Sequence, residues 1–179
     1  MKQLKYFIIH LVITISCKDI EPRRPINKKS ISFIENSIKR NKVITKNQES
    51  IFKNIIKESK SKYIYSEKGF WYSFKKKLSS TNKKKLPKPG DQVSFEYQIE
   101  DVNGKILYEK NSLGVVKYYV DKEDILPALR EGIKLLKNGE SAYFLFPSFL
   151  CHGYSGDGEK IGINQPLKIF IEITEHIKL

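Results

Sequence analysis

The sequence offers few side chains of the types and spacing that acid–base, nucleophilic or metal-dependent catalysis requires. His152 and His176 have no carboxylate or cysteine partner at metal-ligand spacing, so no metal site is predicted. A nucleophile elbow and a phosphate-binding loop are also missing from the sequence. Glu123 and Asp124 precede a predicted helix, where interaction with the helix dipole explains them. The sequence therefore predicts neither a metal nor a cofactor.

One of the two cysteines, Cys17, stands where modification chemistry is expected. It follows a segment in which two lysines precede about ten mostly apolar residues, a pattern typical of a signal peptide and too short to span a bilayer of ~30 Å. The residues Thr14-Ile15-Ser16-Cys17 resemble a bacterial lipobox, in which the cysteine is lipidated and becomes the new N-terminus. A plain secretory signal and a buried apolar segment are the alternatives. Lipidation of Cys17 would leave Cys151 without a partner for an internal disulfide.

The predicted elements are arranged around the stretch 120–153. Asp124 is a candidate N-cap, and Asn138-Gly139 supplies the left-handed residue that ends a helix. A short aromatic strand is predicted over 142–146, stopped by Pro147. Between these signals, apolar residues recur at helical spacing: Ile125, Leu126, Leu129, Ile133 and Leu136. We therefore expect a short helix that lies across a sheet.

Strand patterns flank this helix on both sides. Apolar and polar residues alternate over 93–100 and again over 167–174, and the latter strand is expected in the middle of the sheet. The pair Asn103-Gly104 predicts a hairpin turn. Shorter strands are predicted over 70–74, 106–108 and 115–120. Because strands lie on both sides of one central helix, the sequence predicts an α+β half-barrel.

The N-terminal half differs from the C-terminal half in charge and in pattern. Residues 18–90 contain 21 basic and 6 acidic residues, whereas residues 91–179 contain 10 basic and 14 acidic residues. The basic half favours anionic surfaces such as lipid headgroups, and nucleic acid is not expected as a partner of an exported chain. The capping-box spacing of Ser32 and Glu35 predicts one helix. A second helix is predicted from near Asn47, with an apolar stripe of Ile51, Phe52, Ile55 and Ile56.

The central stretch resembles the FKBP-type peptidyl-prolyl cis–trans isomerases. The resemblance rests on Leu-Pro-x-Leu-x-Glu-Gly-Ile-Lys-x-Leu-x-x-Gly-Glu-x-Ala-x-Phe-x-x-Pro-Ser, which begins at Leu126 and is followed by Gly153. It implies a twisted antiparallel half-barrel sheet wrapped on a short central helix, with a proline-binding pocket between them. On this basis the chain divides into a signal peptide (1–16), a lipid-anchored tether (17–29), an N-terminal helical extension (30–64) and an FKBP-type isomerase domain (65–179).

The resemblance also assigns a candidate site, position by position. Tyr97, Leu126 and His152 are the candidate catalytic residues: the Leu126 N–H would bond a substrate carbonyl, and His152 stands where most relatives have a tyrosine hydroxyl. Leu129 replaces the aromatic residue that floors the pocket, which keeps the floor apolar but removes a stacking surface for proline. Tyr108 stands in place of an aspartate, and Leu107 and Val116 in place of phenylalanines. The remaining pocket residues implied are Ile125, Ile161 and Ile169.

Two functions are open for such a site. The first is prolyl isomerisation, which requires none of the catalytic groups missing from the sequence. Partial double-bond character of the C–N bond gives a barrier of ~18–20 kcal/mol, and an apolar pocket lowers it by binding the twisted amide better than the planar amide. The alternative is a non-catalytic, lipid-anchored chaperone or scaffold that keeps the fold with a degenerate pocket. The family frame favours the first function, and the altered pocket residues favour the second.

A narrower resemblance bears on location and partners. Cys17, Arg23-Arg24-Pro25, residues 67–72 and Lys160-Ile161-Gly162 are similar to FKBP-type lipoproteins associated with bacterial gliding motility. This resemblance implies an exported protein, lipid-anchored to the bacterial envelope at the outer membrane facing the periplasm. Its expected partners are proline-containing polypeptide clients, and it would assist the folding of envelope, motility or secretion proteins. Similar exported proteins dimerise through N-terminal helices, so a homodimer through residues 30–64 is an arrangement that the resemblance allows.

Overall fold

The computed structural model describes residues 28–79 and 84–178. The chain divides into two compact units, residues 1–38 and residues 39–179. The expected signal peptide and Cys17 lie outside the described residues, so lipidation stays a prediction. None of the helices in the described part combines the length and the apolar character needed to cross a membrane.

One long helix, α2, spans Lys28–Glu58. The prediction of two separate helices, starting near Ser32 and near Asn47, is therefore wrong. One helix continues because the segment contains no glycine or proline to interrupt its backbone hydrogen bonds. Within the second unit, Phe52 of the predicted stripe is fully buried, whereas Ile51 is exposed. The buried side of the helix is therefore rotated from the predicted one.

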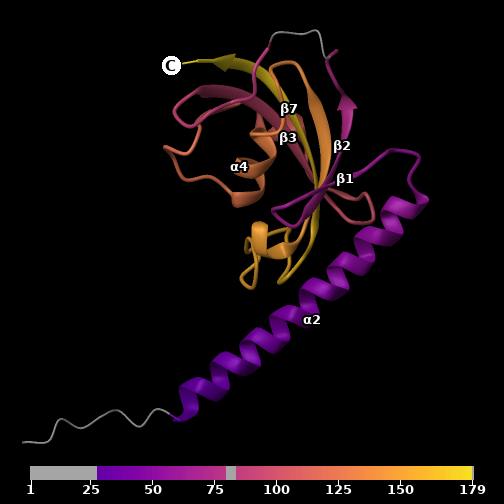
Figure 1. Cartoon of the computed structure of the whole chain (residues 1–179), viewed down its shortest axis with the longest axis vertical. Helices are drawn as coiled ribbons and strands as arrows, with labels where there is room; N and C mark the ends of the chain where they lie inside the picture. Colours follow the sequence, from indigo (N-terminus) through magenta and orange to yellow (C-terminus); the bar gives the residue numbers. More distant parts are fainter. Residues whose placement is uncertain (1–27, 80–83, 179) are drawn as a thin grey trace, which may run out of the picture. The chain divides into compact units, whose positions relative to one another are not determined.

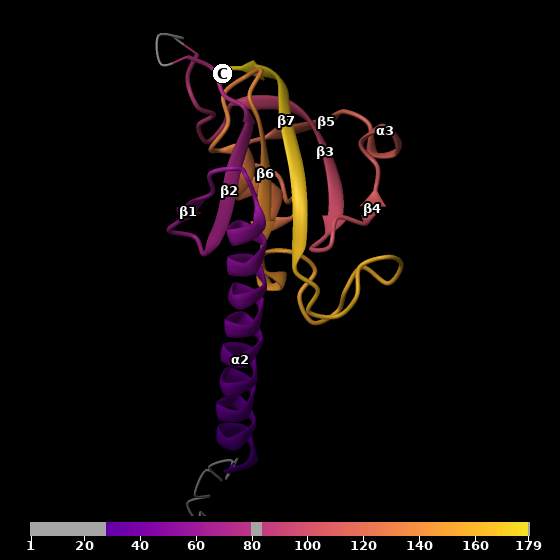
Figure 2. The ribbon, with the colours of Figure 1, turned by 90° about the vertical axis from the view of Figure 1, so that its right-hand side faces the viewer.

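The strands form one antiparallel sheet in the order β1-β2-β6-β7-β3-β4, with β5 pairing with β3 (Figures 1 and 2). The predicted α+β half-barrel is confirmed, and β1 has no counterpart among the predicted strands. The strands are β1 (Ile64–Ser66), β2 (Phe70–Lys76), β3 (Gln92–Asp101), β4 (Ile106–Tyr108), β5 (Val116–Tyr119), β6 (Ser141–Phe146) and β7 (Leu167–Ile177).

Strands β3 and β7 lie side by side in the middle of this sheet (Figure 2). The prediction that the last strand is central is therefore confirmed. The other edge of β3 is shared by two strands: β5 pairs with its first half and β4 with its end. Val93, Phe95 and Ile99 of the predicted alternation are buried, and they belong to the main hydrophobic core.

The central helix, α4, spans Pro127–Ile133 and lies across the inner face of the sheet (Figure 1). It is shorter than predicted, and its N-cap is Leu126, not Asp124. Proline suits the first helical position but forces the residue before it into an extended conformation, and Leu126 has φ −48° and ψ 126°. The pair Asn138-Gly139 lies in the turn before β6 and does not end the helix.

At Gly132 the helix approaches the sheet too closely for a side chain. A Cβ atom there would lie 2.8 Å from Cδ1 of Ile171 on β7 and 3.4 Å from Cζ of Phe146 on β6. The glycine in the Glu-Gly-Ile part of the sequence motif is thus explained by packing between α4 and the sheet.

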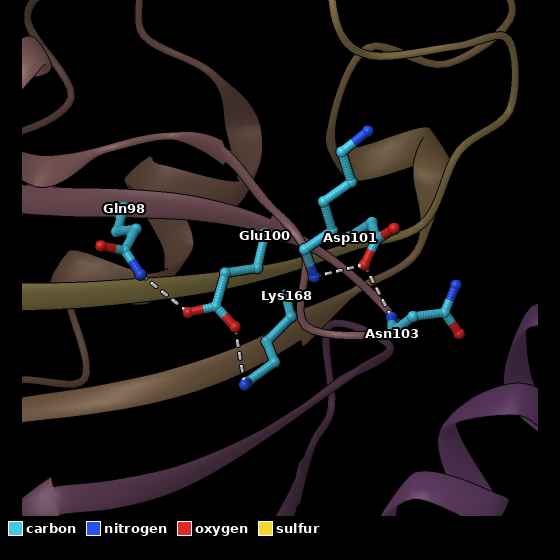
Figure 3. A network of polar contacts seen from close by, with 6 residues as sticks. Gln98, Glu100, Asp101, Asn103 and Lys168 are labelled. Atoms are coloured by element: carbon cyan, nitrogen blue, oxygen red, sulfur yellow. Dashed lines mark hydrogen bonds and ion pairs between the residues drawn. The ribbon is translucent and has the colours of Figure 1, made fainter.

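A polar network lies at the end of β3 (Figure 3). The buried carboxylate of Glu100 accepts hydrogen bonds from Nε2 of Gln98 at 2.8 Å and from Nζ of Lys168 at 2.7 Å. Oδ1 of Asp101 accepts the backbone N–H of Asn103 at 2.8 Å and stabilises the predicted hairpin turn into β4. Two short helical elements complete the second unit: α3 (Lys110–Leu113) and the 3₁₀ turn η1 (Ser148–Leu150).

Candidate functional site

The inner face of the sheet positions four of the candidate residues. Tyr97 stands opposite Ile171 on β7, and Val116 stands opposite Phe95 on β3. Residues directly opposite one another on paired strands place their side chains on the same face. A row across β6, β7, β3 and β4 consists of Phe144, Ile169, Ile99 and Tyr108. The candidates Tyr97, Tyr108, Val116 and Ile169 therefore share one face.

A β-bulge adds Leu107 to the same side. The pairing of β3 with β4 shifts register between Ile99 and Glu100, which leaves Leu107 as the extra residue on β4. Neighbours in a regular strand point to opposite faces, but a bulge re-aims its side chains. Leu107 and Tyr108 both pack against the hydrophobic core.

The segment that enters α4 supplies three more candidates. Leu129 is buried in the helix, while Ile125 and Leu126 are half-buried and pack against the core from the extended residues before it. Because Leu126 is the N-cap residue of α4, its N–H has no carbonyl partner within the helix.

The long connection between β6 and β7, residues 147–166, is called the β6–β7 loop here, and it carries Ile161 and His152. Asp157 fastens this loop to β4. The hydroxyl of Tyr108 donates to Oδ2 of Asp157 at 2.5 Å, and Oδ1 of Asp157 accepts the N–H of Ile161 at 2.8 Å. Ile161 is buried, and His152 is half-buried in a turn. The His152 ring makes no hydrogen bond with any described residue, so its ring N–H can donate to a ligand.

Hydrogen bonding and burial shift four pKa values near the site. The bond to Asp157 raises the pKa of Tyr108 to about 12. Desolvation acts to raise the pKa of Asp157, but the bonds from Tyr108 and from two backbone N–H groups outweigh it and lower that pKa to about 2. Burial raises the pKa of Tyr97 and that of the Cys151 thiol. A raised thiol pKa disfavours the reactive thiolate, which agrees with a structural role for Cys151.

Nine of the ten candidates for catalysis and substrate binding therefore converge on one hydrophobic cluster. Leu129, Ile161 and Ile169 belong to its buried part. His152 is not among its members, but it lies near Asp157, the carboxylate that bonds to Tyr108 of the cluster. The half-buried members that pack against the cluster are Tyr97, Leu107, Tyr108, Val116, Ile125 and Leu126. The fold thus brings buried and half-buried apolar side chains of the candidate site together, and the roles of these residues remain predictions.

Two residues that hold the site were not predicted from the sequence. Asp157 lies between glycines, a composition typical of turns in which an aspartate accepts backbone N–H groups. Gln48 of α2 is buried and bonds to the β6–β7 loop. Its signal is a polar residue at helical spacing between the apolar Ile44 and Phe52, one turn away on either side.

Comparison with known proteins relates this arrangement to one family. The model of the FKBP-type peptidyl-prolyl cis-trans isomerase family matches residues 83–174, about half of the chain. A curated relative, the probable FKBP-type peptidyl-prolyl cis-trans isomerase FkpA of Neisseria meningitidis serogroup B, is 30% identical over 100 residues. The match covers 55% of this chain and 36% of that protein, so the chain spans only about a third of its relative's length.

Solved structures share the fold. A peptidyl-prolyl cis-trans isomerase from Pseudomonas syringae pv. tomato has a TM-score of 0.61 at 15% identity, covering 76% of this chain and 96% of that one. FkpA from Escherichia coli has a TM-score of 0.58 at 20% identity, covering 97% of this chain and 81% of that one. At such low identity these likenesses establish the fold alone.

Proposed function

We propose that this chain, which belongs to the family of FKBP-type peptidyl-prolyl cis-trans isomerases, catalyses cis–trans isomerisation of Xaa–Pro bonds in exported polypeptides. The observation that carries the proposal is the convergence of candidate residues from β3, β4, β5, α4, β7 and the β6–β7 loop on one apolar cluster. The family implies a proline pocket between the central helix and the sheet, and the convergence of residues from both elements supports the proposal.

The proposed mechanism needs only binding. Apolar side chains such as Ile161 and Ile169 desolvate the prolyl amide, and the twisted amide loses less by desolvation because it has less charge separation across the C–N bond. The Leu126 N–H holds the substrate carbonyl, and the His152 ring N–H is a second donor. Each 1.36 kcal/mol removed from the barrier of ~18–20 kcal/mol accelerates the reaction about tenfold.

A non-catalytic chaperone or scaffold is the second candidate, and the pocket substitutions favour it. Leu129, Leu107 and Val116 offer no aromatic surface on which a proline ring can stack. The ring N–H of His152 also lies at a different distance from the backbone than a tyrosine hydroxyl would. In this alternative the apolar cluster serves only as the core of the domain.

A protease-coupled prolyl isomerisation assay on residues 18–179 distinguishes the two functions. We expect turnover above the uncatalysed rate in the unmodified chain, because the apolar cluster and the Leu126 donor are both in place. Leu129→Trp and His152→Tyr variants are measured beside it. An inactive chain that gains activity in the double variant would contradict the enzyme proposal and favour the scaffold.

Location and assembly are part of the same proposal. Lipidation of Cys17 would anchor the protein to the bacterial envelope. The proposed location is the outer membrane, facing the periplasm. There the protein would serve a gliding-motility or secretion assembly. Labelling with a radioactive fatty acid should mark the unmodified chain and not Cys17→Ala; equal labelling would contradict the anchor.

A homodimer through the N-terminal helix is also proposed. Phe33, Ile34 and Ile38 each expose half or more of their surface, and apolar side chains in this number on one short helical segment favour a partner. Light scattering of the chain beside a Phe33→Ser/Ile34→Ser/Ile38→Ser variant should show a dimer and a monomer, respectively; a monomeric unmodified chain would contradict the proposal.

A further inference from the structure

The base of the β6–β7 loop is closed by its own backbone. The N–H of Asn164 donates to the carbonyl of Gly153 at 2.7 Å, and the N–H of Gly153 donates to the carbonyl of Ser148 at 2.9 Å. Ser148, Gly153 and Asn164 are thereby brought together at one end of the loop. The candidate donor His152 lies immediately before this junction.

Gln48 of α2 bonds to both sides of that junction. Its Nε2 donates to the Ser148 hydroxyl and to the Asn164 carbonyl, each at 2.9 Å. Its Oε1 accepts the N–H of Ser148 at 3.0 Å. Gln48 and Ser148 are each only 4% exposed. A side-chain amide is both donor and acceptor, so the single residue Gln48 satisfies polar groups at both ends of the β6–β7 loop.

Apolar packing does little to hold the loop against the helix beside this junction. A cavity of about 290 Å³ lies there, lined by Ile44 and Thr45 of α2 and by Phe149 and Tyr154 of the loop, among others. Phe149 and Tyr154 are 55% and 67% exposed. Figures 1 and 2 both place this loop beside the segment of α2 that belongs to the second unit. The guanidinium of Arg40 lies 5.3 Å from the centroid of the Tyr154 ring, on the exposed side. The buried contacts between this part of α2 and the loop are the Gln48 hydrogen bonds, so the position of the loop depends mainly on them.

The loop is thus fastened at two points. Tyr108 on β4 holds the segment with Asp157 and Ile161, and Gln48 on α2 holds the base. His152 lies between these two points in the sequence. We propose that Gln48 is a positioning residue for the proposed isomerase site: it sets the place of His152 and Ile161 relative to α4. The C-terminal half of α2 would then be a working part of the isomerase and not only a spacer. This inference rests on the proposed function.

The test compares Gln48→Leu with Phe52→Leu in residues 18–179, the same form of the chain that the isomerisation assay uses. Leucine keeps the volume at position 48 but cannot form the hydrogen bonds. Phe52 is buried one turn further along α2, against Trp71 of β2 at 5.8 Å between ring centroids, so its replacement weakens α2 packing but leaves the Gln48 hydrogen bonds to the loop in place. Both variants are examined by thermal unfolding, by isomerase kinetics on a short proline peptide, and by amide hydrogen exchange.

For Gln48→Leu we expect kcat/KM to fall about tenfold, mainly through a rise in KM. The net free energy of about one hydrogen bond corresponds to a change of that size. Amides of Gly153 and Asn164 should exchange about tenfold faster, while those of β3 and β7 change little. Phe52→Leu should lower Tm about as much as Gln48→Leu does. It should leave kcat/KM within about twofold of the value for the unmodified chain. Ser148→Ala, which removes only the hydroxyl, should give a smaller change of the same kind and serves if Gln48→Leu does not fold.

The outcomes separate the two proposals. Unchanged kcat/KM in an active Gln48→Leu protein would overturn the positioning role and leave the isomerase function standing. Equal losses of kcat/KM in Gln48→Leu and Phe52→Leu would also overturn it, since general loosening of α2 would then suffice. An inactive unmodified chain would overturn the proposed function, and unchanged loop exchange in Gln48→Leu would overturn the positioning of the loop itself.

Discussion

The inner face of the sheet and the β6–β7 loop both supply candidate site residues, but different forces hold them. On the sheet, Phe144, Ile169 and Ile171 are fully buried, and contact among many apolar atoms fixes them. In the loop, a few directional bonds fix the chain: Gln48 at the base and the Tyr108–Asp157 pair further along.

This difference predicts how each region responds to change. Burial stabilises in proportion to apolar area, without strict geometry, so the sheet side should tolerate apolar substitutions of similar volume, such as exchanges between leucine and methionine. A hydrogen bond is lost entirely when one partner is removed. We therefore expect sheet variants to change global stability and loop variants to change the local order of the site.

Phe144→Ala should have the largest effect of these substitutions, and it tests how much apolar burial on the sheet contributes to stability. Phe144 is fully buried and contacts the rings of Phe70, Tyr72 and Phe146. Truncation of a buried phenylalanine to alanine costs about 3–5 kcal/mol of unfolding free energy, which denaturant titration measures. The matched control is Phe149→Ala in the loop, where an exposed ring should cost about 0.5 kcal/mol or less. Similar losses in both variants would contradict the contrast.

Gly156→Ala tests the loop by strain, with Gly158→Ala as its control. Both glycines have positive φ, 65° and 80°. A Cβ at Gly156 would lie 2.4 Å from the carbonyl oxygen of Ile161, whereas nothing lies within 4 Å of one at Gly158. We expect Gly158→Ala to cost about 1 kcal/mol for its backbone conformation and Gly156→Ala roughly 1–3 kcal/mol more. Unfolding titrations measure these costs, and exchange of the Ile161 amide reports the local order of the loop. Equal costs in the two variants would show that the loop backbone shifts without strain to accept the Cβ atom.

The Tyr108–Asp157 pair should give the smallest effect, seen as a dependence on pH. The Asp157 pKa of about 2 lies below its ordinary value of 3.8, so the stability it contributes is present above pH 3.8 and is lost as the pH falls toward 2. The Tyr108 pKa of about 12 lies above its ordinary value of 10.0, so its contribution is complete below pH 10 and is lost as the pH rises through 12.

Tyr108→Phe isolates the contribution of this bond. Without the phenol donor, the Asp157 pKa should rise toward 3.8, although the two backbone N–H groups keep part of the shift. Carboxyl chemical shifts from an NMR pH titration measure that pKa, and the unmodified chain titrated under the same conditions is the control. An unchanged Asp157 pKa would show that the backbone N–H bonds alone lower it and would contradict the contribution of Tyr108.

Local sequence signals predicted much of the sheet. Alternation over 93–100 and 167–174 indicated β3 and β7, and Asn103-Gly104 indicated the hairpin between β3 and β4. These signals succeed because side-chain period and turn conformation depend on neighbouring residues. The prediction of two N-terminal helices was wrong for a related reason: the capping-box spacing at Ser32 and the apolar stripe after Asn47 each indicated a separate helix, but no glycine or proline breaks the segment between them.

By itself, the sequence determined the family, the strand pattern and the apolar character of the candidate site, since these are recorded in spacing along the chain. Only the tertiary structure decided how the β6–β7 loop is held. Gln48 meets Ser148 across 100 residues and Tyr108 meets Asp157 across 49. The spacing along α2 can mark Gln48 as a buried polar residue, but the pairing of each donor with its acceptor leaves no periodic signal, because the packed sheet and helix bring the two together.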